Sequence, residues 1–441
     1  MKDIHMTDKP TSTVTPRPAM SNTNIKGLSA NIILLGIVSF LNDVSSEMII
    51  PILPMFLRSL GGAGLAVGLA GGLRDSIPSI LNVLSGYWSD KVRKRKIFVW
   101  AGYLSSAVFK LFLTLSKTSA HAVIFSALER TGKGLRTPAR DAIIAESAAT
   151  QRGKGFGIHR AFDTSGAILG SIIAFLLSGV LGLGFKLVIL IAGVIAFASL
   201  VPLRFVKESK GDPQPLQKIN LRELPRSLKL FIAAAGVFAL GNFSYMFFIL
   251  RVQQAFTGKL SVAMPILLYI LFNIFYAAFA VPFGNLSDRI GRGKIIILGY
   301  LLFSLTSFGF ARLDAAKLGD AGFNTLPAFI ILFAIYGVAY AAIESNQRAY
   351  ASDLSPAQLK ATALGVFHMT MGLMALPASL AAGALWQKVA PSATFIYGGV
   401  LGLVSVLLLA IFMSSTGSPQ VSSTGSPQVG SASPPQRASS Q

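Results

Sequence analysis

The sequence has no cysteine, few histidines and few charges. Of its 441 residues, 13% are charged and 52% are hydrophobic, whereas soluble domains carry about 25% charged residues. Without cysteine there is neither a disulfide framework nor a thiolate metal site. With only 4 histidines, zinc and copper chemistry is not expected either, so we predict no metal and no cofactor. The composition predicts a chain that lies mostly in lipid.

Motifs for catalysis and for nucleic-acid binding are also missing. The sequence has no phosphate-cradling P-loop, nucleophile elbow or HExxH motif, which argues against an enzyme and against ATP-driven transport. The formal net charge is +21, but the bases fall in short runs between apolar segments. We interpret them as topology signals and expect no nucleic-acid partner.

Apolar stretches long enough to span a membrane recur along the chain. A hydrocarbon core of about 30 Å takes about 20 helical residues, and only a helix satisfies the backbone there. The first six candidate spans are 30–57, 65–88, 96–116, 120–145, 155–182 and 184–204. The second six are 228–251, 262–286, 294–312, 325–350, 360–387 and 392–413. This pattern predicts an all-α membrane protein with twelve transmembrane helices in two six-helix bundles.

The polar segments divide the chain further. We expect the bundles at 28–204 and 228–413, a basic cytoplasmic linker at 205–227, and disordered tails at 1–27 and 414–441. Lys and Arg crowd the turns at 91–96, 152–154 and 289–294 and are sparse in the alternate turns. Both termini are therefore predicted to be cytoplasmic, in a multi-pass protein of the inner membrane without a cleaved signal peptide.

One turn motif occurs twice. The turn after the second span reads GYWSDKVRKR from residue 86, and the turn after the eighth reads GNLSDRIGR from residue 284. Both resemble the loop signature of the major facilitator superfamily, although Trp88 and Arg93 depart from it in the first copy. The resemblance implies two related bundles with a substrate site between them near the membrane midplane. The candidate gating residues are Gly86, Asp90, Lys91, Gly284, Asp288 and Arg289; the alternative is a plain basic turn.

Ionisable residues inside apolar spans are costly and suggest function. Asp43 and Glu47 are four residues apart, on one face of the first helix, and are either functional or buried partners of Arg74 or Arg130. The candidates for the substrate and proton pathway in the first half are Asn42, Asp43, Glu47, Arg74, Asp75, Glu129, Arg130, Arg160 and Asp163. In the second half they are Asn242, Asn273, Glu344 and Arg348.

Two further resemblances concern the fourth and fifth spans. Arg130, with Gly132 and Gly134, resembles the functional arginine of the fourth helix in this superfamily, which implies substrate binding or proton relay; the alternative is snorkelling to the surface. The fifth span has Arg160 and Asp163 placed to pair, and its glycines resemble the opening of an antiporter signature that then fails at Ser171. This partial match favours export.

The residues together favour a proton-coupled secondary transporter of a small organic solute. Asp43 or Glu47 would carry the proton, Arg130 would contact the solute, and the bases of the first half favour an anion. One alternative is iron or an iron chelate, because Asn42, Asp43 and Glu47 offer oxygen ligands. Another is a membrane sensor or assembly factor that moves nothing. We expect a monomer whose partners are a small-molecule substrate and membrane lipid.

Overall fold

The computed structural model describes residues 29–92, 94–148, 151–208, 224–313, 322–356 and 359–416, and its regular structure there is helical throughout. The first half contains α1 (Ala30–Ile49), α2 (Leu53–Ser59), α3 (Gly64–Val92), α4 (Arg95–Thr114), α5 (Ser119–Ser147), α6 (Arg152–Ala174), η1 (Phe175–Val180), α7 (Phe185–Ala198) and α8 (Leu200–Leu203). The second half contains α9 (Arg226–Gly241), α10 (Met246–Ala255), α11 (Leu260–Ile290), α12 (Arg292–Arg312), α13 (Gly322–Asp353), α14 (Lys360–Lys388) and α15 (Pro391–Thr416). The predicted N-terminal tail, the predicted C-terminal tail beyond residue 416 and most of the predicted linker lie outside the described residues.

The twelve predicted spans appear as helices. The fifth ends in the π-helix η1, the sixth is broken at Ser199 between α7 and α8, and the first and seventh have longer breaks. The first is broken between α1 and α2 at Pro51, where the missing N–H ends the helical ladder. The seventh is broken between α9 and α10 without a proline, which the sequence did not predict. There the Ser379 hydroxyl accepts from the freed Ser244 N–H at 3.2 Å, so a side chain of another helix satisfies the broken backbone.

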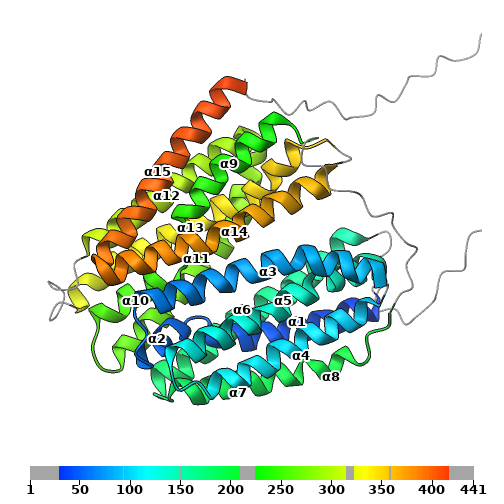
Figure 1. Ribbon diagram of the computed structural model, residues 1–441, viewed down its shortest axis with the longest axis horizontal. Helices are drawn as coiled ribbons and strands as arrows, with labels where there is room; N and C mark the ends of the chain where they lie inside the picture. The colour runs from blue at the N-terminus through cyan, green and yellow to red at the C-terminus, as the bar shows by residue number, and fades with distance from the viewer. Residues whose placement is uncertain are drawn as a thin grey trace, which may run out of the picture.

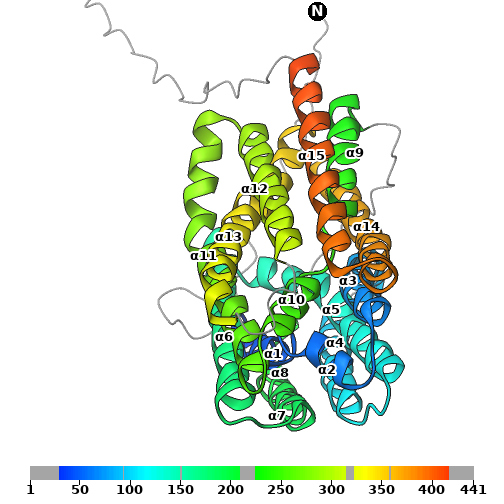
Figure 2. The same cartoon turned by 90° about the vertical axis from the view of Figure 1, so that its left-hand side faces the viewer.

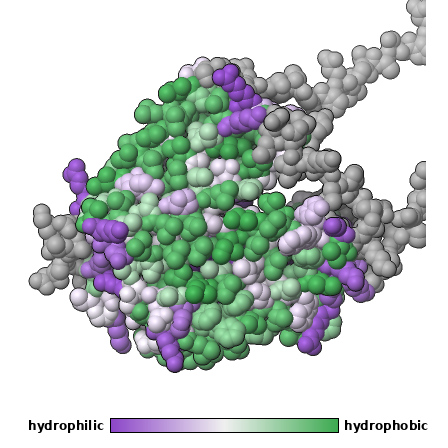
Figure 3. All heavy atoms as spheres, in the orientation of Figure 1, coloured by the Kyte–Doolittle hydropathy of each residue, from purple (hydrophilic) through white to green (hydrophobic). Residues whose placement is uncertain are grey.

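The surface matches a membrane environment. Among the described residues, 10 helical segments are long and apolar enough to cross a bilayer. The other two, α3 and α5, are each 29 residues long and carry charges that lower their hydropathy. On the face seen in Figure 3, apolar side chains form a broad band, and hydrophilic ones gather toward its two ends. The chain is therefore an all-helical multi-pass membrane protein.

The two halves repeat one packing scheme. In the first, α1 packs on α6 and α7, α4 on α5, and α3 on α5. In the second, α9 packs on α14 and α15, α12 on α13, and α11 on α13. These are equivalent pairs in the two sets of six spans. Figures 1 and 2 show the halves as two adjoining bundles.

The halves meet along α3 and α14, where glycines allow the backbones to touch. A Cβ added to Gly68 would lie 2.1 Å from the carbonyl oxygen of Ser379, and one added to Gly383 would lie 2.5 Å from that of Gly64. Small residues permit such close packing in membranes. We call this end, with the turns at 60–63 and 389–390, the closed end.

At the opposite end the halves diverge (Figure 1). This end carries the C-terminus of α3, residue 291 between α11 and α12, and the chain at 208 and 224 on either side of the linker, and we call it the linker end. A Cβ added to Gly284 or Gly365 there would meet nothing within 4 Å, and one at Gly86 would meet only Pro138 of its own half. The two halves are thus closed together at one end and open at the other.

This packing predicts that Gly383→Ala destabilises the protein. Even one methyl group would meet the Gly64 backbone, and overpacking of this kind costs about 1–3 kcal/mol. Gly365→Ala is the matched control on the same helix, because its Cβ meets open space. Thermal unfolding in detergent should show a lower midpoint for Gly383→Ala only; equal midpoints would contradict the close contact.

Candidate functional site

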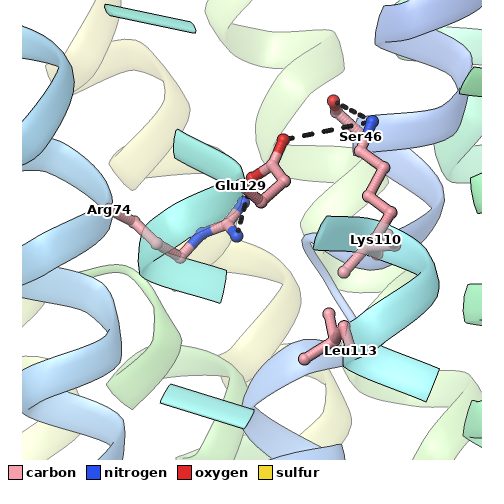
Figure 4. A pocket seen from close by; sticks show the side chains of 6 residues that line it. Ser46, Arg74, Lys110, Leu113 and Glu129 are labelled. Carbon is pink, nitrogen blue, oxygen red and sulfur yellow. Dashed lines mark hydrogen bonds and ion pairs between the residues drawn. The ribbon is translucent and has the colours of Figure 1, made fainter. Parts of the chain in front are cut away.

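Glu129 on α5 is the centre of a buried charge cluster. Its Oε2 lies 3.3 Å from Arg74 Nη1 of α3 and 3.3 Å from Arg130 Nε, and its Oε1 lies 4.0 Å from Lys110 Nζ of α4. All four residues are at most 9% exposed. Figure 4 shows Arg74 and Lys110 reaching Glu129 from opposite sides. One carboxylate thus partners three bases inside the bundle.

Lys110 was not among the residues predicted from sequence. It is 1% exposed, and its Nζ donates to Ser45 Oγ and Ser46 Oγ of α1, each at 2.9 Å. A lysine in the middle of an apolar span meets the same criterion that selected Arg74 and Glu129. Lys110 could therefore have been predicted from the sequence, whereas nothing in the sequence marks Ser45 and Ser46 as its partners.

Glycines position this cluster. A Cβ on Gly132 of α5 would lie 2.3 Å from the carbonyl oxygen of Gly102 on α4, and one on Gly134 would lie 2.5 Å from Leu81 Cβ on α3. The three helices therefore approach closely at the level of Glu129, where their charged side chains meet. A small pocket opens beside the cluster (Figure 4). Its lining residues are Ser46, Ile49, Arg74, Lys110, Leu113 and Glu129.

A second polar cluster lies nearer the linker end of the same half. Ser39 Oγ is 2.9 Å from Tyr103 OH and 2.9 Å from His159 Nε2, and it accepts from Arg140 at 3.2 Å. His159 Nδ1 lies 3.6 Å from Asp163. The expected pairing of Asp163 with Arg160 is therefore replaced by one with His159, four residues away on the helix, and Arg160 is exposed.

Asp43, Glu47 and Asp75 stand apart from the ion pairs. In the part of the chain that is described, none of them has a basic partner within 4 Å, so the alternative pairing of Asp43 or Glu47 with Arg74 or Arg130 is not formed. Glu47 instead accepts from Tyr269 OH of the second half at 3.1 Å. Asp75 is exposed although it lies in the middle of α3. Of these carboxylates, Glu47 and Asp75 lie near groups of the second half.

The second half contributes fewer charges and many rings. Glu344 on α13 pairs with Arg348 at 2.6 Å and accepts from Tyr276 OH. Asn273 donates to the Tyr269 carbonyl at 3.0 Å. Asn242 Oδ1 and Tyr245 OH are buried without a hydrogen-bond partner among the described residues.

The candidate gating residues sit at the open end. In the second copy, Asp288 lies 3.1 Å from Arg292, which also reaches Asp353 at 2.6 Å. In the first copy Lys91 is exposed, and the side chain of Asp90 lies outside the described residues. The gating role of both copies stays a prediction.

The described side chains include no group of three histidine or acidic residues arranged to hold a metal ion. Asn42 donates from its amide nitrogen to Asp43 Oδ1 at 3.4 Å, and the iron alternative stays a prediction.

Known proteins resemble this chain along most of its length. The profile of the Major Facilitator Superfamily matches residues 35–268 and 230–438. An uncharacterized MFS-type transporter of Methanocaldococcus jannaschii is 54% identical over 394 residues, which cover 88% of this chain and 96% of the relative. Multidrug resistance protein MdtH of Aeromonas hydrophila is 22% identical over 386 residues, 85% of this chain and 93% of its own.

A solved structure shares the fold. It is a bacterial homolog to the human lysosomal transporter Spinster, in an inward-facing and occupied conformation. The TM-score is 0.66 at 13% sequence identity, and the match covers 87% of this chain and 94% of the other.

The cluster predicts that Glu129→Gln is strongly destabilising. Three bases would lose their one buried acid, and breaking such a buried pair costs about 3–5 kcal/mol. Lys110→Met should cost less, because Glu129 keeps Arg74 and Arg130. Unfolding midpoints in detergent test this order, with Glu208→Gln at the exposed linker end as the control. A Glu129→Gln midpoint equal to that of the control would contradict the proposed structural role.

Proposed function

The chain belongs to the major facilitator superfamily, and we propose that this membrane transporter is a secondary transporter that moves a small organic solute by alternating access. The observation that carries the proposal is the arrangement of the halves. They pack backbone to backbone at the closed end and diverge at the linker end, with charged residues exposed at mid-helix between them. A charge is costly in lipid and stable beside water, so these residues favour a hydrated solute path.

Asp75 and Lys133 support a cleft between the halves. Both are exposed in the middle of long helices. Asp75 lies within Coulombic range of Arg130 in its own half and of Tyr336 and Tyr340 in the other. A side chain near both halves that still meets solvent must border the space between them.

We propose that Asp43 and Glu47 couple transport to protons. The two lie on one face of α1 near the cleft, without an ion-pair partner. The charged groups within Coulombic range of Asp43 include Lys133, Arg136 and Arg140 of α5 and Asp163 of α6. Those within range of Glu47 include Arg130 and Lys133 of α5, with Tyr269 of α11 as its hydrogen-bond donor. Protonation of either acid would change its attraction to these bases, and protonation of Glu47 would also change its hydrogen bond with Tyr269 of the other half.

We propose that the linker end faces the cytoplasm and that transport is outward. The basic turns at this end support the orientation, which places both termini inside and makes this conformation inward-facing. The multidrug resistance protein among the relatives is consistent with efflux. A monomer in the inner membrane remains part of the proposal.

The ion pairs alter the argument for an anionic solute. Arg74, Lys110 and Arg130 are all held by Glu129, so the excess of bases in this half does not face the cleft freely. The charge of the solute is therefore better argued from the groups that border the cleft.

Alternating access predicts opposite distance changes at the two ends. The chain has no native cysteine, so spin labels can be placed by substitution alone: Val92→Cys with Lys360→Cys at the linker end, and Leu115→Cys with Val389→Cys at the closed end. Double electron–electron resonance measures the distance between the two labels of each pair. Between pH 5.5 and 8.5, we expect this distance to shorten for one pair as it lengthens for the other.

The double variant Asp43→Asn, Glu47→Gln tests the coupling. In this background we expect both distance distributions to become independent of pH, because the titrating groups near the cleft are lost. The variant Glu208→Gln, which changes an exposed acid at the linker end, is the control and should behave as the wild type. Unchanged pH dependence in the Asp43/Glu47 variant would contradict the proton role, and distances fixed under every condition would contradict alternating access.

A further inference from the structure

Lys110 is a buried base that the proposed transport mechanism does not use. Its Nζ lies 2.9 Å from Ser45 Oγ and 2.9 Å from Ser46 Oγ of α1, and 4.0 Å from Glu129 Oε1 of α5. Figure 4 shows its ammonium group between Ser46 and Glu129. An ammonium group has three donors and no acceptor, so this one side chain connects α4 to two other helices at once.

The two serines lie between the acids that we propose for proton coupling. Ser45 and Ser46 follow Asp43 and precede Glu47 in α1. Successive helical residues are turned by about 100°, because about 3.6 residues complete a turn. Asp43 and Glu47 are therefore about 40° apart on one face, whereas Ser45 lies on the opposite face. Lys110 thus holds the back of the helix whose front carries both acids.

The remaining contacts of α1 within its half are of a different kind. A Cβ added to Gly170 of α6 would lie 2.4 Å from the carbonyl oxygen of Val44, so the two backbones touch there. On the α7 side, the Ser45 hydroxyl donates to the Ala192 carbonyl at 2.5 Å. Contact with a glycine offers no side chain to interlock, whereas a hydrogen bond has a preferred direction. The serine contacts are therefore suited to fix the rotation of α1 about its axis.

Two side chains of α4 reach hydroxyl groups of α1. Besides Lys110, Tyr103 places its OH 2.9 Å from Ser39 Oγ, nearer the linker end. Ser39 precedes Asp43 by one helical turn, and Ser46 lies next to Glu47. The part of α1 that carries the two acids is therefore attached to α4 on both sides of them.

The charge of Lys110 acts on α1 as well as on α5. The groups within Coulombic range of it include Glu129, Arg130 and Arg136 of α5 and Asp43 of α1, and Arg74 of α3 shares Glu129 with it. The two arginines of α5 repel the ammonium and Glu129 attracts it. Its bonds to the serines keep this positive charge beside α1, where it favours an ionised carboxylate.

We propose that Lys110 is a positioning residue for proton coupling. Through its bonds to Ser45 and Ser46 it fixes the rotation of α1, and so the direction in which Asp43 and Glu47 face. This inference rests on the proposed proton role of the two acids and links the buried charge cluster to them. Lys110 itself neither contacts the solute nor carries the transported proton.

The pH midpoint of the conformational change tests this role in the full-length protein that carries the label pairs described above. Lys110→Met keeps most of the apolar stem and removes the donors, whereas Ser45→Ala with Ser46→Ala keeps the lysine and removes its acceptors. In both, the ammonium is no longer held against α1. We expect each to move the midpoint to higher pH by at least about 0.5 unit, or about threefold in proton concentration.

The combined variant, Lys110→Met with Ser45→Ala and Ser46→Ala, shows whether the lysine acts through the serines. If it does, the combined shift should not exceed the larger of the two separate shifts. Additive shifts would show that the lysine and the serines act independently and would overturn the positioning role. An unchanged midpoint in the folded serine variant would overturn it as well.

Unfolding midpoints in detergent separate positioning from stability alone. A residue that only stabilises the bundle would lower the unfolding midpoint and leave the pH midpoint unchanged, and that result would overturn the inference. The matched control is Ser304→Ala with Ser405→Ala. These hydroxyls are 1% and 0% exposed and bond to carbonyls of their own helices in the second half. The control should keep the wild-type pH midpoint; an equal shift there would contradict the assignment to Lys110.

The Asp43→Asn, Glu47→Gln variant keeps this failure separate from failure of the proposed function. If that variant loses the pH dependence while the Lys110 and serine variants keep the wild-type midpoint, only the positioning role is wrong. If that variant keeps the pH dependence of the wild type, the proton role fails and the inference about Lys110 fails with it.

Discussion

A charge inside a membrane protein needs a partner or water, and that requirement organises this structure. Glu129 supplies the partner for Arg74, Lys110 and Arg130, which lie on three different helices. The same contacts fix how α3, α4 and α5 pack, because glycines must bring these helices close before one carboxylate can reach three bases. The cluster is thus at once an electrostatic unit and the packing centre of the first bundle.

Two charges outside this cluster, those of Asp75 and Lys133, are exposed instead. Both are exposed at mid-helix because the halves separate toward the linker end. At the closed end, by contrast, the glycines of α3 and α14 hold the halves in contact. A transporter that alternates must exchange these two arrangements. The hydrogen bond from Tyr269 to Glu47 joins the two halves. A change in the charge of Glu47 would therefore alter a contact that both halves share.

The sequence predicted the helices well because length and hydropathy are local properties. All twelve spans followed from it, whereas the break at 242–245 did not, because a serine from a distant helix satisfies the backbone there. Most site residues were found by one criterion, an ionisable group within an apolar span. Their partners were not: Asp163 pairs with His159 rather than Arg160, and Glu129, not Asp43 or Glu47, holds the bases. Such pairings depend on tertiary packing that spacing along one helix does not reveal.

The central claim is that charged residues of the first half border a water-filled cleft open at the linker end. Lys133→Cys would give the chain a single thiol, and a membrane-impermeant thiol reagent added to either side of sealed vesicles would test the claim directly. We expect the reagent to modify the introduced thiol when it is added on the side of the linker end. When it is added only on the other side, and the protein stays in this conformation, we expect no modification. A thiol that reacts from neither side would show that these charges belong to the packed core, and would contradict the account.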